Sequence, residues 1–89
     1  MSHETWVSVK AREALDRAGV PLQGIVQGHL TGAWPDLKGR TVMVNEQRLS
    51  ACIVGRQVVW VWTEDDGSVT VALMEEVSRA NIQRGGRTN

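Results

Sequence analysis

The sequence has one cysteine, two prolines, no phenylalanine and no tyrosine. A single cysteine, Cys52, cannot form a disulfide within the chain, which excludes a disulfide-stapled secreted scaffold and favours a reducing compartment. No segment reaches the roughly 18 apolar residues that a membrane span requires, and the first residues do not have the pattern of a signal peptide. These absences predict a cytoplasmic protein that has no membrane partner.

Catalytic and metal-binding signatures are also missing. The motifs HExxH, CxxC, GxSxG and the phosphate-binding P-loop do not occur, and His3 and His29 lie far apart in the chain. Cys52 has no histidine near it in sequence that could activate its thiol. We therefore expect no catalytic residue, no metal and no cofactor, and the sequence favours a binding protein over an enzyme.

Neither sign of charge is in excess. Ten basic and ten acidic residues cancel, so the overall balance favours neither nucleic acid nor an anionic membrane as a partner. The charges are unevenly spread, because Arg40, Arg48 and Arg56 stand against Glu46 alone between positions 40 and 63. A solvated surface is the ordinary interpretation of such a cluster.

Two helices are predicted near the N-terminus. Apolar residues recur there at helical spacing in two successive sets, which are Ala11, Ala14, Leu15 and Ala18, then Leu22, Ile25, Val26 and Leu30. Gly19 and Pro21 separate the two helices. Gly24 and Gly28 weaken the second helix, or allow another element to approach it closely. Residues 5–9 fit either a short strand or the lead into the first helix.

The pattern then changes from helical to alternating. Four apolar segments follow, at 41–45, 48–54, 57–63 and 68–73, with turns at 46–47, 55–56 and 66–67. Links this short force antiparallel neighbours. The prediction is an α+β fold in which two N-terminal helices pack on one face of a four-stranded antiparallel meander, followed by a short C-terminal helix at 74–84. Residues 1–84 would form a single domain and 85–89 a flexible tail.

Two-residue turns would also determine which side chains share a face of the sheet. Counting from the three turns places Trp60 and Trp62 on the core face, beneath the helices. The predicted core face of the sheet comprises Val42, Val44, Leu49, Ala51, Ile53, Val58, Trp60, Trp62, Val69, Val71 and Leu73.

The opposite face is predicted to be open and uncharged. Its candidate partner-binding residues are Met43, Cys52, Val54, Val59, Val61 and Thr70. Uncharged exposed surface of this kind commonly marks an interface. Three explanations remain open: the terminal helix covers this face, a second copy or another protein covers it, or it is simply a mild surface of threonine and valine.

Two further side chains are informative. His29 shares the apolar stripe of the second helix, which favours a hydrogen-bonded core or boundary histidine over a ligand or a base. Trp34 precedes Pro35 in a loop, where it either plugs the end of the core or is presented to a ligand, and the plug is favoured.

The stretch VSVKAREALDRAGVPLQGIV carries a resemblance to a known family. A helix, a glycine, a β-branched residue, a second helix and an antiparallel meander resemble the layout of RelE and ParE-type toxins and their small relatives, over most of the chain. Such relatives often have a histidine-alanine pair, an arginine four positions after the histidine, and another arginine before the glycine. This sequence has Lys10-Ala11, Ala14 and Ala18-Gly19 at those places, so only the alanine and the glycine match.

The resemblance implies RNA binding on the side of the sheet away from the helices. The phosphate-binding candidates would be Lys10, Arg12, Arg40, Arg48 and Arg56. Guanidinium groups bind phosphate through their planar forks. The acid-base groups of such ribonucleases have no match here, so the resemblance favours a binding derivative over a competent nuclease.

Three hypotheses follow. The first is a small non-catalytic interaction module that binds a protein partner, or forms a homodimer, through its uncharged sheet face. The second is an RNA-directed, toxin-like protein that uses the five cations named above. The third is a small DNA-binding regulator, suggested by Arg79, Arg84 and Arg87 near the end of the chain.

Overall fold

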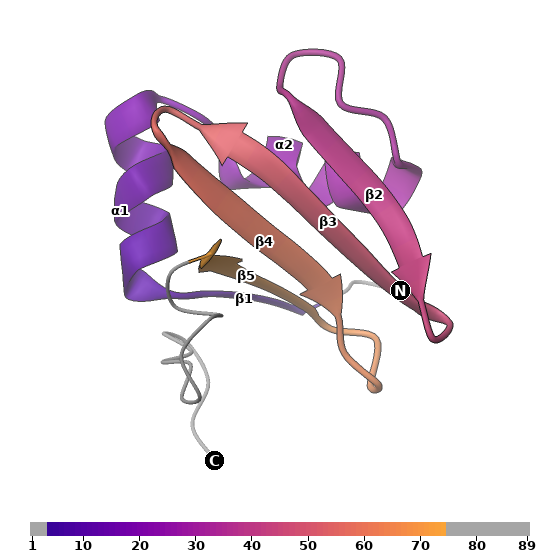
Figure 1. The fold of residues 1–89 in the computed structure, drawn as a ribbon. Helices are drawn as coiled ribbons and strands as arrows, with labels where there is room; N and C mark the ends of the chain where they lie inside the picture. The colour runs from indigo at the N-terminus through magenta and orange to yellow at the C-terminus, as the bar shows by residue number, and fades with distance from the viewer. Residues whose placement is uncertain (1–3, 75–89) are drawn as a thin grey trace.

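The computed structural model describes residues 4–74 and shows an α+β fold with two helices on one side of a five-stranded sheet (Figure 1). The α+β prediction is confirmed at this level. The elements in chain order are β1 (Thr5–Val7), α1 (Val9–Ala18), α2 (Leu22–Thr31), β2 (Gly39–Val44), β3 (Gln47–Val54), β4 (Gln57–Thr63) and β5 (Val69–Leu73).

The sheet is mixed, with the strand order β1-β5-β4-β3-β2. Strands β2 to β5 form the predicted meander, but β1 adds a fifth strand that runs parallel to β5. Backbone bonds from Val69 N to Glu4 O (2.8 Å) and from Ser8 N to Val71 O (2.9 Å) hold β1 in place. The prediction of four antiparallel strands was therefore incomplete. The predicted C-terminal helix and tail lie outside the described residues.

Helix α1 begins and ends where its sequence signals lie. The Ser8 side chain accepts a hydrogen bond from Ala11 N (3.1 Å), and Gly19 ends the helix in the left-handed conformation at φ 70°. Ala11, Ala14 and Leu15 are buried as their spacing predicts, whereas Ala18 is exposed.

Helix α2 is held at its C-terminal end by a side chain from the sheet. Arg48 of β3 donates hydrogen bonds to the carbonyl oxygens of His29 (3.2 Å) and Leu30 (2.7 Å). A cation at this position satisfies the last carbonyl groups and complements the helix dipole. Arg48 therefore ties α2 to β3.

The first two hairpins preserve the predicted faces. Asn45 and Glu46 both have positive φ, at 52° and 65°, as the central residues of a type I′ turn require. This turn lies one residue before the predicted one, so Val42 rather than Val44 pairs with Leu49. A turn one residue earlier shifts the β2–β3 pairing by two residues. Because side chains alternate between the two faces, a shift of two leaves each residue on its predicted face. The β3–β4 register is as predicted, with Leu49, Ala51 and Ile53 opposite Trp62, Trp60 and Val58.

The third hairpin differs by one residue. Gly67 N donates to Glu64 O (3.0 Å), Glu64 N donates to Ser68 O (2.7 Å), and Gly67 has φ 88°. These bonds define a three-residue loop with a glycine bulge, not a two-residue turn. The Asp66 carboxylate stabilises it by accepting from Ser68 N (2.9 Å) and Ser68 Oγ (2.6 Å). Val71 consequently pairs with Val61 instead of Trp62.

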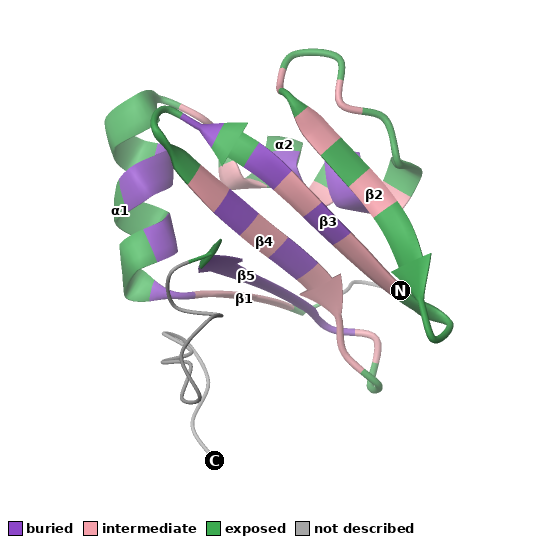
Figure 2. Ribbon diagram, viewed as in Figure 1, coloured by how far each residue is buried: buried purple, intermediate pink, exposed green. Residues whose placement is uncertain are grey.

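The one-residue difference changes the composition of the core. The helices pack on the face that carries the small and β-branched residues, and the purple positions of Figure 2 alternate along β3 and β4 accordingly. The placement of Trp60 and Trp62 on the core face was wrong. The strand residues of the core are Cys52, Val54, Val59, Val61, Val69, Val71 and Leu73, packed against Ala11, Ala14, Leu15 and Ile25.

Candidate interaction surface

The side of the sheet away from the helices carries three of the four tryptophans. We call this surface the tryptophan face. The register assigns to it Trp6, Arg40, Val42, Val44, Gln47, Leu49, Ala51, Ile53, Val58, Trp60, Trp62, Thr70 and Ala72. One row crosses all five strands, from Trp6 through Thr70, Trp62 and Leu49 to Val42.

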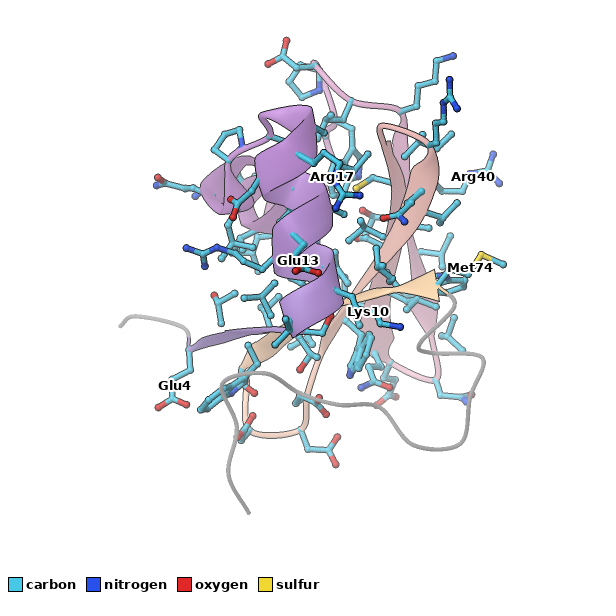
Figure 3. All side chains as sticks on the ribbon, turned by 90° about the vertical axis from the view of Figure 1, so that its left-hand side faces the viewer. Glu4, Lys10, Glu13, Arg17, Arg40 and Met74 are labelled. Atoms are coloured by element: carbon cyan, nitrogen blue, oxygen red, sulfur yellow. The ribbon has the colours of Figure 1, made fainter. Side chains whose placement is uncertain are left out.

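Much of this face is apolar and open to solvent. Val42 is 43% exposed and Val44 and Ile53 are each 47% exposed, while the three indoles are partly buried. Arg40 is the one charged residue among the strand positions assigned to the face. Figure 3 shows Arg40 and Met74 projecting on the side of the sheet away from α1. An aliphatic and aromatic surface with so little charge is unusual for a sheet face left in water.

Hydrogen bonding on this face is uneven. The Glu64 carboxylate accepts from Trp62 Nε1 (2.9 Å) and from Thr70 Oγ1 (2.7 Å), which fixes one indole. Trp60 Nε1 is buried and has no hydrogen-bond partner within residues 4–74. An unsatisfied buried donor costs roughly 1–3 kcal/mol. The face therefore holds one indole that is anchored and one whose donor is unused.

The predicted partner-binding residues are not on one open face. Cys52, Val54, Val59 and Val61 are at most 2% exposed, because the helices cover them. Thr70 is 1% exposed and belongs to the tryptophan face, and Met43 is 60% exposed on β2. The error comes from the β4–β5 loop, which moved the aliphatic residues of β5 onto the other side.

The predicted phosphate-binding cations do not converge. Arg48 is occupied by the α2 carbonyl groups, and Arg12 lies 3.9 Å from Asp16 in the i, i+4 ion pair. Lys10 is in the first turn of α1, and Figure 3 shows it far along the helix from Arg17. Arg40 and Arg56 are exposed, on the sheet and on the β3–β4 turn. The arrangement offers no single site to which all five could contribute.

Trp34 is the tryptophan that plugs the core. Its indole lies against Gly28 of α2 and Gly39 of β2, where any added Cβ would overlap the ring, and its Nε1 donates to Thr41 Oγ1 (3.0 Å). The glycine in α2 thus permits a close approach, here of a side chain. The outer side of Trp34 lines an apolar groove of about 480 Å³ together with Pro21, Pro35 and Leu37.

A buried polar network extends from Trp34 into the core. His29 is fully buried, with Nδ1 2.6 Å from Ser50 Oγ and Nε2 2.8 Å from Thr63 Oγ1. Ser50 Oγ is also 2.7 Å from Thr41 Oγ1. A serine paired with a histidine could suggest a nucleophile, but Ser50 is 1% exposed and no substrate can reach it. His29 is the hydrogen-bonded core histidine that its position predicted.

The burial of His29 makes the free energy of unfolding depend on pH. Desolvation, with a contribution from the nearby Arg48 charge, lowers the pKa of His29 from 6.5 to about 4. Between these two values the unfolded chain binds a proton that the folded chain does not. The free energy of unfolding should therefore fall by up to about 3 kcal/mol as the pH is lowered from 6.5 to 4. Urea unfolding across this range measures the loss.

The matched variant is His29→Gln, which cannot titrate. Its unfolding free energy should be lower than that of the wild type at pH 7, and the difference between the two proteins should shrink as the pH falls to 4. Parallel pH profiles for the two proteins would show that His29 titrates in the folded state as it does in the unfolded chain.

Among residues 4–74, no group of three or more His, Cys, Asp or Glu side chains is arranged to hold a metal ion. No helix in this part of the chain is long and apolar enough to cross a membrane. Comparisons of the chain with protein-family models, curated proteins and solved structures found no match.

Proposed function

We propose that this protein is a non-catalytic interaction module that binds a protein partner through the tryptophan face. The observation that carries the proposal is the composition of that face: exposed Val42, Val44 and Ile53 of β2 and β3 lie beside the partly buried Trp60 and Trp62 of β4, with Arg40 as the single charged strand residue. Burying such a surface releases about 25 cal/mol for each Å² of apolar area removed from water. Tryptophan is also enriched among the residues that dominate binding energy.

The face suits a partner with an extended apolar side. Trp62, Leu49 and Val42 form a row of large side chains across β4, β3 and β2, and Ala51 leaves a shallow position beside Trp60. An amphipathic helix could lie across this row with its apolar side against the indoles. Arg40 at the border of the face would then favour an acidic residue on that partner. A partner carbonyl could also use the free donor of Trp60 if the ring turns outward on binding.

The other two hypotheses receive less support. RNA binding would require the cations to act together, whereas Arg48 and Arg12 are engaged elsewhere. The resemblance to RelE and ParE-type toxins stays a prediction. The arginines that suggested DNA binding, Arg79, Arg84 and Arg87, lie outside the described residues.

A pair of lysine variants tests the proposal. Ile53→Lys places a charge on the exposed apolar surface, whereas Gln23→Lys places it on an exposed position of α2. A partner captured by the wild-type protein and identified by cross-linking should be retained by Gln23→Lys. Ile53→Lys should weaken its binding at least about 10-fold, because a charge must be desolvated without a counter-ion.

Val58→Lys provides a second position on the same face, next to Ile53 in the register. If both face variants bind the partner as well as Gln23→Lys does, the tryptophan face is not the binding surface. Circular dichroism of all three variants distinguishes lost binding from lost folding.

A further inference from the structure

Among the described residues 4–74, strand β2 forms a free edge of the sheet. It is the last strand in the order β1-β5-β4-β3-β2 and pairs with β3 alone (Figure 1). The opposite edge, β1, has 3 residues, whereas β2 has 6. Edge strands expose unpaired N–H and C=O groups, which are a template for another strand.

The register shows which backbone groups of β2 point outward. Val44 and Gln47 flank a two-residue turn and so exchange both hydrogen bonds, and the bond from Ile53 N to Lys38 O (2.9 Å) continues the same alternation. The even-numbered residues of β2 therefore bond to β3. The N–H and C=O groups of Gly39, Thr41 and Met43 point away from the sheet.

This edge lacks the usual protection against pairing. Strand β2 contains no proline, its register with β3 has no bulge, and Arg40 is its single charged residue. Val42, Met43 and Val44 are 43%, 60% and 47% exposed. Natural edge strands are normally short, charged, bulged or interrupted by proline. The unpaired donors and acceptors of such an edge can form hydrogen bonds with an added strand.

We propose that β2 pairs antiparallel with β2 of a second copy of this chain. An antiparallel pairing of identical strands is isologous, so each outward donor of one copy meets an acceptor of the other about a two-fold axis. Because opposed residues of antiparallel strands lie on one side, the helices of both copies would share a side. Two five-stranded sheets would then form one sheet with a continuous tryptophan face. The pairing goes beyond the proposed function, since it concerns the edge and not the face.

The size of the contact sets the expected affinity. Pairing through one 6-residue strand buries less surface than the roughly 1,200–2,000 Å² of a standard stable interface. The dimer should therefore be reversible, with a dissociation constant in the micromolar range. A concentration series is required to observe it.

Sedimentation and amide hydrogen exchange, measured on the same samples, test the pairing. The mass should rise from 9.8 kDa toward twice this value with concentration. The amide hydrogens of Thr41 and Met43 should become protected in step with the mass, whereas the Val42 amide, bonded to β3, is protected throughout. Met43→Pro removes an outward donor from each copy and should weaken the dimer about 30-fold, whereas Met43→Ala keeps the donor and should have a smaller effect.

A monomer at every concentration overturns the proposal. So does a dimer in which the Thr41 and Met43 amides exchange as fast as in the monomer, or one that Met43→Ala weakens as much as Met43→Pro. Failure of the proposed function is seen separately, because Ile53→Lys and Val58→Lys alter the face and leave the backbone of β2 intact.

Discussion

Val59→Lys is expected to unfold the protein or to lower its unfolding free energy by about 3 kcal/mol or more, because the ammonium group enters a core without a counter-ion. Val59 is 0% exposed and packs against the helices. Ile53→Lys makes a similar change on the neighbouring strand, but Ile53 is 47% exposed on the tryptophan face. Its effect should stay within about 1 kcal/mol, as is usual for surface substitutions.

Urea unfolding of both variants at pH 7 measures the two effects. The comparison is matched, since each variant replaces a β-branched strand residue with lysine. Equal losses at the two positions would mean that both sides of the sheet are covered in the folded protein. A larger loss at Ile53 would mean that the faces are reversed.

Alanine is expected to have opposite effects at two glycines of the same helix. A Cβ at Gly28 would lie 2.7 Å from Trp34 Cδ2 and closer still to the outer ring atoms, so Gly28→Ala must displace the indole. We expect a loss of about 1–3 kcal/mol from overpacking. A Cβ at Gly24 meets only Pro21 Cγ, at 3.7 Å, so Gly24→Ala should gain up to about 1 kcal/mol from its better helix propensity.

The double variant Gly28→Ala, Trp34→Leu identifies the cause. If the ring is the obstacle, Gly28→Ala should cost much less when Trp34 is already leucine. Thermal unfolding of the four proteins in this cycle gives the coupling. Additive effects would show that Gly28 is required for a reason other than the position of the indole.

Local signals predicted the two N-terminal helices and the β3–β4 hairpin correctly, whereas the turns of the other two hairpins each differ by one residue from the prediction. Gly19 ends α1, the apolar spacing identifies Ala11, Ala14 and Leu15, and the short link at Gly55 determines the β3–β4 register. These features depend on residues close in sequence. The burial of His29 was also predictable, because its place on the stripe of α2 is a matter of helical spacing.

The faces of the sheet were not predictable from turn residues alone. Asp66 and Gly67 fit a two-residue turn, but the Asp66 carboxylate bonds to Ser68 and stabilises a longer loop. One added loop residue moves Val69, Val71 and Leu73 to the other side. A signal was present in composition: these three residues are aliphatic like Val59 and Val61, and all five share one core cluster with the small Ala11 and Ala14 of α1.

The candidate surface needed the tertiary structure for a second reason. Strand β1 is short, and only its pairing with β5 brings Trp6 into the row of Trp62. Likewise, nothing local shows that Arg48 would bond to α2 instead of remaining available to a ligand. Contacts between segments far apart in sequence decide both points.

The reactivity of Cys52 tests most directly whether the helices cover the side of the sheet that carries Cys52, Val59 and Val61. The test needs no substitution. Cys52 is 1% exposed, and burial raises its pKa from 9.0 to about 11. The native protein at pH 7 should therefore react with a disulfide reagent at least about 100-fold more slowly than the urea-unfolded chain, since the thiolate is the reactive form. A native rate close to the unfolded rate would mean that this face is open and that the helices do not cover it.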